Sequence, residues 1–482
     1  MWPLLIFEMA LVGYSYAYHR WGGANQRPAA RPADISLPRV DFGAPVPLIY
    51  GKCLVRTPFL AYSGNNHIPE PDPGNTLYEL DMMFVVGVPF YGGRATLGVA
   101  NSMWAGDTRC GTLLDPTEGP GERQIFVMNT SGAPEDLSGF GEFFSGSPTQ
   151  NVGDPGTRTR ASMMLAGIDP TRIPGYRNQV VFSFVGQGTG AGMTLGRSPQ
   201  VPAFGFEVSS LSTGTPADMG QSLDEDADPA AVIFDLLTSP WGKLGLPESK
   251  VDRASFEAAS VVLFAEGHGY SRCFDQVDDA FTMIDDVLRQ IDAVLYEEPT
   301  TGKFTLRLIR KDYNVGTLDD INPDNVSAIS NYSAQGWSET PNQVRVTYTK
   351  RALVGRRSNY VEGLAIGQNE ANAIAQGGKR RPVDIRYAGC CTDELAQKLA
   401  SRELAVLSQP SVLLTVVVNR SFYEARPGDV FTFTWPELGI NKMVMRVARV
   451  NLGQLHDGRI SLDLMRDIFD ASVGAYPVPV AA

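Results

Sequence analysis

Glycine and proline interrupt this chain throughout, and their density limits how long its helices can be. Together they occupy 82 of 482 positions, 49 as glycine and 33 as proline, against roughly 12% in an average protein. Glycine favours turns and proline ends helices. Because 43% of the residues are apolar, the chain can still build packed cores and is not disordered. We therefore expect a mainly β protein with α+β parts, divided into roughly three or four domains.

The acidic charge balance argues against general nucleic-acid binding. The 41 basic and 53 acidic side chains give a net charge of −12, whereas proteins that bind nucleic acids generally cluster Lys and Arg against phosphates. Residues 350–386 oppose this trend with a local charge of +5 and only Tyr360 and the adjoining Tyr387 as aromatics. We interpret this stretch as a solvated loop or a contact with acidic neighbouring subunits. Its charged residues are Lys350, Arg351, Arg356, Arg357, Lys379, Arg380, Arg381 and Arg386, against Glu362, Glu370 and Asp384.

The first residues form a nearly continuous apolar segment. Residues 2–18 are nearly all apolar and are interrupted by the charged Glu8. Basic charge follows the segment, whereas a signal peptide has its basic residues in front. A glutamate within a membrane-spanning helix would cost about 2–3 kcal/mol. Three interpretations stay open: a helix buried against partner subunits, a membrane-active segment, and a cleaved or frayed end. We favour the first. Its proposed axial or partner-contact residues are Trp2, Leu5, Phe7 and Leu11.

The rest of the first half alternates between strands and loops. A Gly- and Pro-containing linker over 21–40 leads to strands at 43–51 and 77–88. From about residue 100 to 200, Gly, Pro, Ser and Thr dominate around one clear strand at 180–185, which indicates an inserted, loop-rich β domain. Residues 204–209 are again typical of a strand.

Residues 220–310 have the clearest helical pattern. Asp228 is a good N-cap, and Pro229 suits the first helical position. A second helix is predicted by an apolar stripe and is followed by a strand at 304–308, which together indicate helices on a sheet. The stripe consists of Val277, Phe281, Ile284, Leu288, Ile291 and Leu295.

β-structure returns after residue 340. Val344, Val346 and Tyr348 alternate with polar residues, and further strands are predicted at 413–418, 431–435, 443–450 and 460–464. A helix over 392–408 begins at the N-cap candidate Thr392. Five strands with one helix predict a small barrel.

None of the polar clusters predicts catalysis or metal binding. Gly186, Gly188, Gly190 and Gly192 do not fit G-x-G-x-x-G, and no helix follows them to hold a phosphate. Asp224, Asp226 and Asp228 imitate the start of a calcium loop, but its later positions do not fit, so we interpret them as an acidic linker and helix cap. The Asp pairs at 278–279 and 285–286 lie on the polar side of the predicted helix.

The cysteines and histidines add no site either. Five cysteines without a C-x-x-C pair are too few for a disulfide framework and do not suit structural zinc. His268 and Cys273 are close in sequence, but this alone does not predict a catalytic pair. We expect no catalytic residues, no metal and no cofactor.

Short motifs at both ends of the chain are more informative than any single residue. Near the start, Gly43-Ala-Pro-Val-Pro-Leu-Ile-Tyr-Gly51 contains Pro47, Tyr50 and Gly51 in a Pro-x-x-Tyr-Gly strand. In the middle stand residues 173–177 with the strand 180–185, residues 202–208, and residues 228–242. Near the end, five motifs lie within 44 residues: Arg426-Pro-Gly-Asp-Val430, Trp435-Pro-Glu-Leu-Gly-Ile440, Met445-Arg-Val447, Asp457-Gly-Arg-Ile460 and Asp467-Ile-Phe469.

The order and spacing of these motifs resemble those of hub or tip-attachment proteins of bacteriophage tails, a group that includes the lambda-like tail-tip protein and the large hub of gene transfer agents. The resemblance runs from about residue 40 to 470. The matched positions are interpreted as scaffold: Pro427 and Gly428 as a turn stabilised by Asp429, and Asp457 and Gly458 as a hairpin turn. The remaining scaffold positions are Pro47, Tyr50, Gly51, Trp435, Gly439 and Asp467.

This resemblance implies a tail-hub architecture with two small tube-like β-barrel domains. The expected domains are an apolar helix at 1–23, a first barrel at 24–100 plus 200–220, an inserted loop-rich β domain at 101–199, an α+β domain at 221–312, a second barrel at 313–470 containing the helix 392–408, and a tail at 471–482.

The resemblance also implies a virion protein that is not an enzyme: a homotrimer at the distal end of the tail tube. It would bind the distal tail ring and the tape-measure protein, and open for genome ejection, with DNA passing without specific binding. Lambda-like members continue into a long fibre, so we expect a separate tail fibre or spike here. The N-terminal helix would be a plug or tape-measure dock, with membrane contact during ejection as another role. The alternatives are a tail-associated cell-wall hydrolase, a secretion-system spike hub and a monomeric sugar-binding protein.

Overall fold

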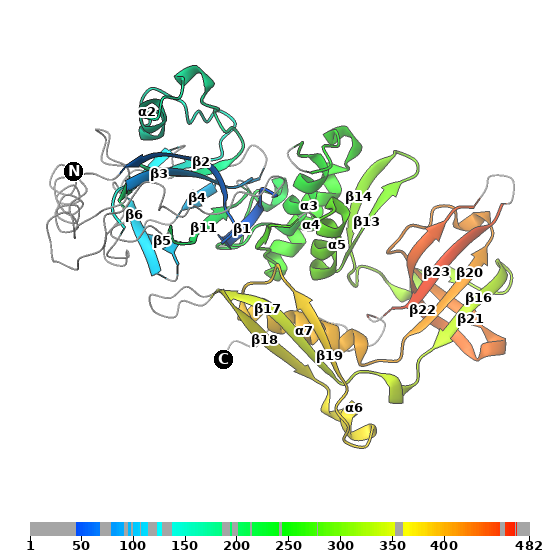
Figure 1. Ribbon diagram of the computed structural model, residues 1–482. Coiled ribbons are helices and arrows are strands. Elements are labelled where there is room, and N and C mark those ends of the chain that lie inside the picture. The colour runs from blue at the N-terminus through cyan, green and yellow to red at the C-terminus, as the bar shows by residue number, and fades with distance from the viewer. Residues whose placement is uncertain are drawn as a thin grey trace. The chain divides into compact units, whose positions relative to one another are not determined.

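The protein folds as two compact units made mostly of β-sheet (Figure 1). The first unit comprises Met1–Leu246, Gly269–Met283 and Arg351–Val361, and the second comprises Pro247–His268, Ile284–Lys350 and Glu362–Ala482. The computed structural model describes residues 45–67, 79–90, 95–97, 100–106, 108–113, 123–127, 137–185, 193–194, 201–212, 215–240, 243–276, 278–351, 360–453, 458–467 and 469. The proposed N-terminal helix with Trp2, Leu5, Phe7 and Leu11, the Gly186–Gly192 stretch and Asp457 lie outside these residues.

One twelve-stranded sheet organises the described part of the first unit. Its main path runs β10-β3-β9-β8-β7-β6-β5-β11-β1-β12, with β2 beside β3 and β4 beside β11. The strands are β1 Leu48–Val55, β2 Phe59–His67, β3 Glu79–Gly87, β4 Ala95–Leu97, β5 Ala100–Ala105, β6 Thr108–Leu113, β7 Arg123–Val127, β8 Phe140–Ser145, β9 Val180–Val185, β10 Met193–Thr194, β11 Phe204–Ser210 and β12 Arg272–Phe274.

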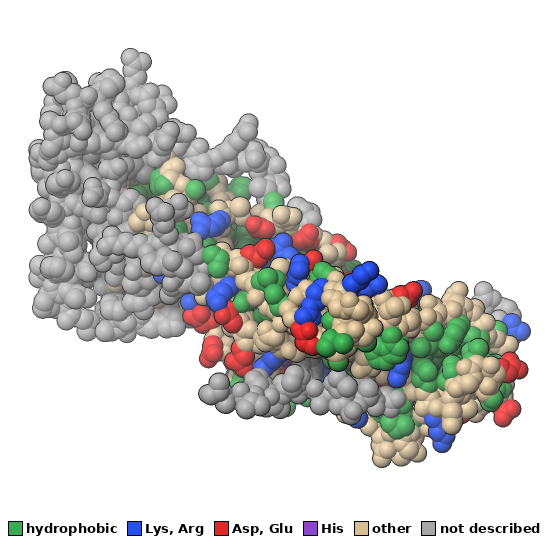
Figure 2. All heavy atoms as spheres, turned by 90° about the horizontal axis from the view of Figure 1, so that it is seen from below, with side chains coloured by type: hydrophobic (Ala, Val, Ile, Leu, Met, Phe, Trp, Pro, Cys, Tyr) green, Lys and Arg blue, Asp and Glu red, His purple; other side chains and the backbone are tan. Residues whose placement is uncertain are grey.

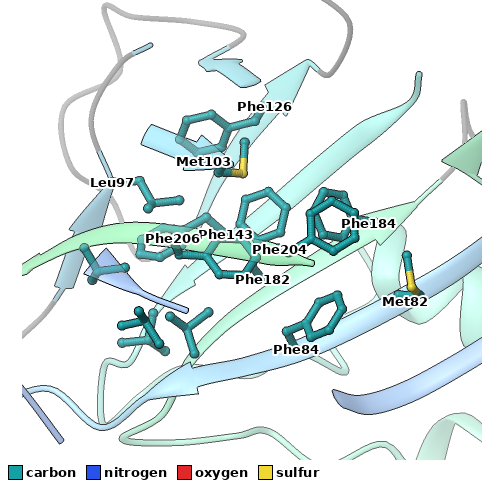
Figure 3. Close-up of a cluster of buried hydrophobic side chains, with 14 of the residues drawn as sticks. Met82, Phe84, Leu97, Met103, Phe126, Phe143, Phe182, Phe184, Phe204 and Phe206 are labelled. Carbon is teal, nitrogen blue, oxygen red and sulfur yellow. The ribbon is translucent and has the colours of Figure 1, made fainter. Parts of the chain in front are cut away.

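Aromatic side chains at alternate strand positions build the core of this sheet (Figure 3). Phe182 and Phe184 of β9 face Phe204 and Phe206 of β11, with ring centroids 5.0 Å apart for the 182–206 pair and 4.3 Å for the 184–204 pair. Phe84 of β3 joins them edge-on to Phe184. Since strand residues two apart share a face, this spacing directs each pair of rings into one core.

The strand pairing continues through the predicted insertion. Strands β5 to β9 lie between β3 and β11 in the same sheet, and Phe126 and Phe143 share the core with Phe84 and Phe206. The Gly- and Ser-rich sequence of 101–199 therefore contains more strands than the one expected, along with the short helix α2, Arg158–Leu165. Sheet pairing gives no boundary at residues 101 and 199, and the division into domains stays a prediction.

The helices of the middle region largely follow the sequence pattern. α3 is Pro229–Thr238, and the Asp228 carboxylate accepts a hydrogen bond from the Ala230 N–H, as its N-cap role predicts. α4 is Arg253–Glu266, and α5 is Ala280–Ile291. The hairpin β13 Ala293–Glu298 and β14 Lys303–Leu308 follows α5.

The predicted apolar stripe of α5 was partly wrong. The helix ends at Ile291 because Asp292 takes a φ of 52°, so Leu295 belongs to β13. Phe281 is 49% exposed, whereas Ile284, Val287 and Ile291 are buried. Val277 lies outside the described residues.

The second unit contains two further sheets, and the strands predicted for one barrel are divided between them. A six-stranded sheet has the order β15-β21-β22-β23-β20-β16, and a three-stranded sheet has the order β18-β17-β19. The six strands are β15 Asp320–Ile321, β16 Val326–Ala334, β20 Val412–Val418, β21 Val430–Trp435, β22 Ile440–Asn451 and β23 Ile460–Arg466. The smaller sheet consists of β17 Gln343–Arg351, β18 Tyr360–Gln368 and β19 Pro382–Tyr387, with helices α6 Glu370–Ala375 and α7 Asp393–Leu407.

The predicted helix at 392–408 is confirmed as α7, and Thr392 caps it through the Leu395 N–H. It packs against β17 rather than the six-stranded sheet, because Leu395 and Leu399 share a core with Val344 and Val346. The five strands expected in one barrel are therefore divided between two sheets. None of the described helices has the length and apolar character needed to cross a membrane.

Candidate functional site

The turn between the short helix Arg420–Phe422 and β21 is the centre of the candidate site. Asp429 Oδ2 accepts a hydrogen bond from the Arg426 N–H at 2.6 Å, and the Asp429 N–H donates to the Arg426 carbonyl at 3.0 Å. Gly428 adopts a φ of +91°, and a Cβ there would lie 3.2 Å from the Arg307 side chain. The predicted turn with Asp429 bound to backbone is thus present, and it also lies against the β13–β14 hairpin.

Two charged pairs bind this turn to that hairpin. Arg426 holds Glu298 of β13 in a bidentate pair, with Nε and Nη2 each 2.7 Å from a carboxylate oxygen. Arg307 of β14 pairs with Asp429. A bidentate guanidinium–carboxylate pair fixes orientation as well as distance. We call Glu298, Arg307, Arg426, Asp429, Arg446 and Asp467 the motif joint.

Arg446 of β22 is the most buried cation of the motif joint. Its side chain is 5% exposed, and that of Asp467, 3.3 Å away, is 2% exposed. The guanidinium also donates to the Gly428 carbonyl at 2.7 Å and to the Arg310 carbonyl at 3.0 Å. Tyr313 donates a hydrogen bond to the same Asp467 carboxylate. Arg446 therefore connects the turn, the end of β23 and the segment after β14.

Two more arginines bind the C-terminal end of α5, where helix carbonyls lack partners within the helix. Arg402 of α7, with its side chain 5% exposed, donates to the Gln290 carbonyl at 2.7 Å and pairs with Glu403. Arg310 donates to the Ile291 carbonyl at 3.1 Å and pairs with Glu266. The three-stranded sheet and the six-stranded sheet are thus both fixed to α5 and its hairpin by buried arginines.

Acid should weaken the motif joint through Glu298. The hydrogen bonds from Arg426 lower the pKa of Glu298 from its ordinary 4.5 to about 2. A depressed carboxyl pKa adds stability that is complete above the unfolded-state pKa and disappears as the pH falls through the folded-state pKa. We expect the difference in unfolding free energy between the wild type and Glu298→Gln to be constant above about pH 5.5 and to close between about pH 4.5 and pH 2.

Urea unfolding across this pH range measures that difference. The matched control is Glu297→Gln, an exposed carboxylate next to Glu298 in β13, for which the difference should change less with pH. A Glu298→Gln difference that stays the same from pH 6 to pH 2 would contradict the role given to the Arg426 pair.

The N-terminal motif residues form a separate cluster in the first unit. Tyr50 is fully buried and donates to Asp235 Oδ2 at 2.8 Å, and Lys243, whose side chain is 0% exposed, pairs with the same carboxylate. Burial raises the pKa of Tyr50 and lowers that of Lys243. Pro47 accepts a hydrogen bond from the Val88 N–H. Gly51 lies against Tyr270 and Ser271, directly before β12, with a φ of +67°.

The structure does not bring all the motif positions together. Trp435 stacks on Phe433 at the far end of β21, with centroids 6.0 Å apart, and Gly439 lies in the following turn. Gly458 precedes β23, which pairs with β22 as the hairpin prediction requires. Of the scaffold positions within the described residues, Pro427, Gly428, Asp429 and Asp467 lie at the motif joint, together with Arg426 and Arg446 of the same sequence motifs. The sequence analysis did not identify Glu298, Arg307, Arg402, Asp235 and Lys243 as site residues. The one available signal for such residues is a charged side chain among apolar neighbours, which indicates a buried partner.

The residues rejected as catalytic or metal-binding candidates cap a helix, form buried polar contacts or lie in the core. Asp228 caps α3, and the buried Asp226 binds Ser271 and Arg351. Burial raises the pKa of Cys273 to about 12 and lowers that of His268 to about 3. A thiol and an imidazole shifted in these directions are poorly suited to act as a nucleophile and its base near neutral pH. Among the residues described, no cluster of His, Cys, Asp and Glu could hold a metal ion.

Part of the chain matches a known protein family, and nearly the whole chain resembles a solved structure. Residues 279–450, which contain part of the motif joint, match the family Phage-tail_3, described as "Putative phage tail protein". No curated protein matches the chain in sequence. A chain in the virion of a native gene transfer agent (GTA) particle has a TM-score of 0.57 at 13% identity, covering 96% of this chain and 91% of that chain.

Two tail proteins show weaker likeness. The tail protein of Neisseria meningitidis MC58 has a TM-score of 0.35 at 10% identity, with 83% of this chain and 91% of that chain covered. The 43 kDa tail protein of prophage MuSo2 from Shewanella oneidensis has a TM-score of 0.29 at 11% identity, with 89% and 96% covered. These two scores are too low to bear on the fold. The family match and the fold of the gene transfer agent chain support a structural protein of a phage tail.

Proposed function

We propose that this chain is the hub of a phage tail, a trimeric ring that closes the distal end of the tail tube. The ring binds the distal tail ring on one side, contacts the tape-measure protein inside, carries a separate fibre or spike, and opens for DNA ejection. The observation that carries this proposal is the fold shared with the virion chain over 96% of this chain and 91% of that one.

The buried arginines suit such a role. A hub must keep its parts in fixed positions while it is attached to several neighbours. In the second unit, the buried Arg402 and Arg446 and the partly buried Arg426 fix two sheets to the helix α5 and its hairpin. Removing one partner of a buried ion pair typically costs about 3–5 kcal/mol, so these joints resist deformation. A rigid second unit is what a ring needs to transmit attachment at one surface to another.

The charge of the chain is compatible with passing DNA. Three copies at −12 each give −36, and a negative wall would repel a polyanion rather than hold it. On the described part of the face in Figure 2, Lys and Arg side chains lie beside Asp and Glu side chains. The described part of this face therefore lacks the broad basic stripe on which nucleic-acid binding depends. We propose that DNA passes the ring without specific binding.

The apolar N-terminal segment is proposed to act near the threefold axis, as a plug, as a dock for the tape-measure protein, or through membrane contact during ejection. A cell-wall hydrolase with a Cys/His pair is disfavoured because burial raises the pKa of the Cys273 thiol and lowers that of His268, which leaves a protonated thiol and a weakly basic imidazole. A secretion-system spike hub would have a similar fold and differ in the particle that contains it.

The copy number in purified particles tests the hub proposal. A trimer of the 52.3 kDa chain has a mass of about 157 kDa. Quantitative mass spectrometry of purified virions should find three copies of this chain per particle, measured against a tail protein of known copy number. A number of copies that grows with tail length would contradict a hub and indicate a tube protein.

A further inference from the structure

A protruding basic loop in the second unit is held rigidly. Residues 377–381 connect α6 to β19, and Lys379, Arg380 and Arg381 are all exposed. A Cβ added at Gly377 or Gly378 would meet no atom within 4 Å, so the loop extends into open space. We call Gly377–Arg381 the basic loop.

The buried residue Asn342 fixes the shape of the basic loop. Its side chain donates to the Lys379 carbonyl at 2.8 Å and accepts from the Arg381 N–H at 2.8 Å, and its own N–H donates to the Arg381 carbonyl at 3.2 Å. Asn342 is 0% exposed. A loop fixed before binding loses little conformational entropy when it docks, which favours its use as a contact.

The same unit contains a cleft of complementary charge. The cleft has a volume of about 660 Å³ and is lined by five carboxylates and one arginine, which is Arg307. The carboxylates are those of Asp312, Asp319, Asp320, Glu424 and Asp429. We call it the acidic cleft. Its net charge is −4, and its one cation is already paired with Asp429.

The carboxylates of the acidic cleft are spread rather than gathered on one point. Asp320 accepts hydrogen bonds from Thr432 and Thr434 at 2.8 and 2.9 Å, whereas Asp312, Asp319 and Glu424 are exposed. Within the described residues no acidic group is arranged to hold a metal ion. A cleft of this size with separated carboxylates is better matched by several cationic side chains than by a single ion.

We propose that the basic loop of one copy docks into the acidic cleft of a second copy. The two surfaces are different parts of the same chain, so the contact is heterologous, and repeated contacts of this kind close into a ring when the rotation permits. This inference rests on the proposed ring, and it supplies the contact between subunits. Arg380 already pairs with Glu370 of its own chain, so the contact would neutralise chiefly the charges of Lys379 and Arg381.

A cross-linking experiment with two versions of the full-length chain tests the contact. One version carries Lys379→Cys and the other carries Asp319→Cys, each with its own tag, and the two are mixed under mild oxidation. We expect a mixed disulfide dimer at least about five times more abundant than with the control Glu437→Cys, an exposed acidic residue outside the cleft. High salt should reduce the yield, because it screens exposed charges.

Charge reversal separates docking from chance collision. Arg381→Glu in the first version should reduce the cross-link, and Asp312→Lys in the second should restore it. A yield no greater than that of the control, or one unaffected by both reversals, would overturn the contact. A short Lys- and Arg-rich peptide that occupies the cleft while no mixed dimer forms would also overturn it and assign the cleft to another protein. None of these outcomes depends on where the chain lies in the tail.

Discussion

Replacing Arg446 by methionine should lower the free energy of unfolding of the second unit by about 3–5 kcal/mol. The substitution keeps much of the side-chain volume but leaves the Asp467 carboxylate buried without its cation, and such an uncompensated charge is costly. It also removes the hydrogen bonds to the Gly428 and Arg310 carbonyls. Urea unfolding of the full-length chain measures the loss.

The matched control for Arg446→Met is Arg253→Met. Arg253 pairs with Glu257 one helical turn away on α4, with side chains 49% and 32% exposed. Exposed pairs of this kind contribute about 0.2–1 kcal/mol. The double substitution Arg446→Met with Asp467→Asn should recover part of the loss, since it removes both charges. If Arg446→Met costs no more than Arg253→Met, the motif joint does not hold the second unit together.

Gly51→Ala should destabilise the first unit by about 2–5 kcal/mol. The residue has a φ of +67°, which costs an alanine about 1–2 kcal/mol. The added methyl group would also lie 2.7 Å from the Tyr270 carbonyl and 2.0 Å from Ser271 Oγ. The backbone must move to make room, so pairing of β1 with β12 should weaken, at a cost of about 1–3 kcal/mol.

Gly106→Ala is the control that separates the cost of steric crowding from the cost of backbone strain, because it introduces the strain alone. Gly106 has a similar φ of +62°, but no atom lies within 4 Å of the position of its Cβ. Its substitution should therefore cost only the strain, about 1–2 kcal/mol. Equal losses for Gly51→Ala and Gly106→Ala, measured by urea unfolding of the first unit, would refute the close approach of Gly51 to Tyr270 and Ser271.

Local signals in the sequence predicted individual elements well. The helix at 392–408 and the cap at Asp228 depend on residues close in the chain, and both are present. The strands at 431–435 and 460–464 follow from alternation of apolar residues, whereas 180–185 is a nearly continuous apolar run in which all six residues are buried. The end of α5 was missed because only the backbone at Asp292 reveals that the stripe changes from helix to strand.

Arrangements that depend on distant residues were harder to predict. Nothing local indicates that α7 packs on β17 rather than on the six-stranded sheet, since both sheets offer apolar faces. The motif joint shows the same difficulty: Asp429 was expected in a turn, but its partner Arg307 lies more than a hundred residues earlier. A single charged residue in an apolar strand, as at Arg446, indicates a buried partner without identifying it.

The overall charge of the chain and its local distribution of charge have different consequences. The net charge of −12 on the whole chain disfavours DNA binding, and three copies would carry −36 around the proposed conduit. Locally, the basic loop and the acidic cleft separate charge of both signs within one unit. This separation is a basis for contact between copies, whereas the overall excess is a basis for repelling a polyanion.

The position of the chain in the particle tests the hub proposal most directly. Purified virions are labelled with gold-conjugated antibodies raised against the full-length chain and imaged by electron microscopy. The hub proposal predicts label at the distal tip of the tail, with the shaft and capsid unlabelled. Label distributed along the tail shaft or on the capsid would contradict it.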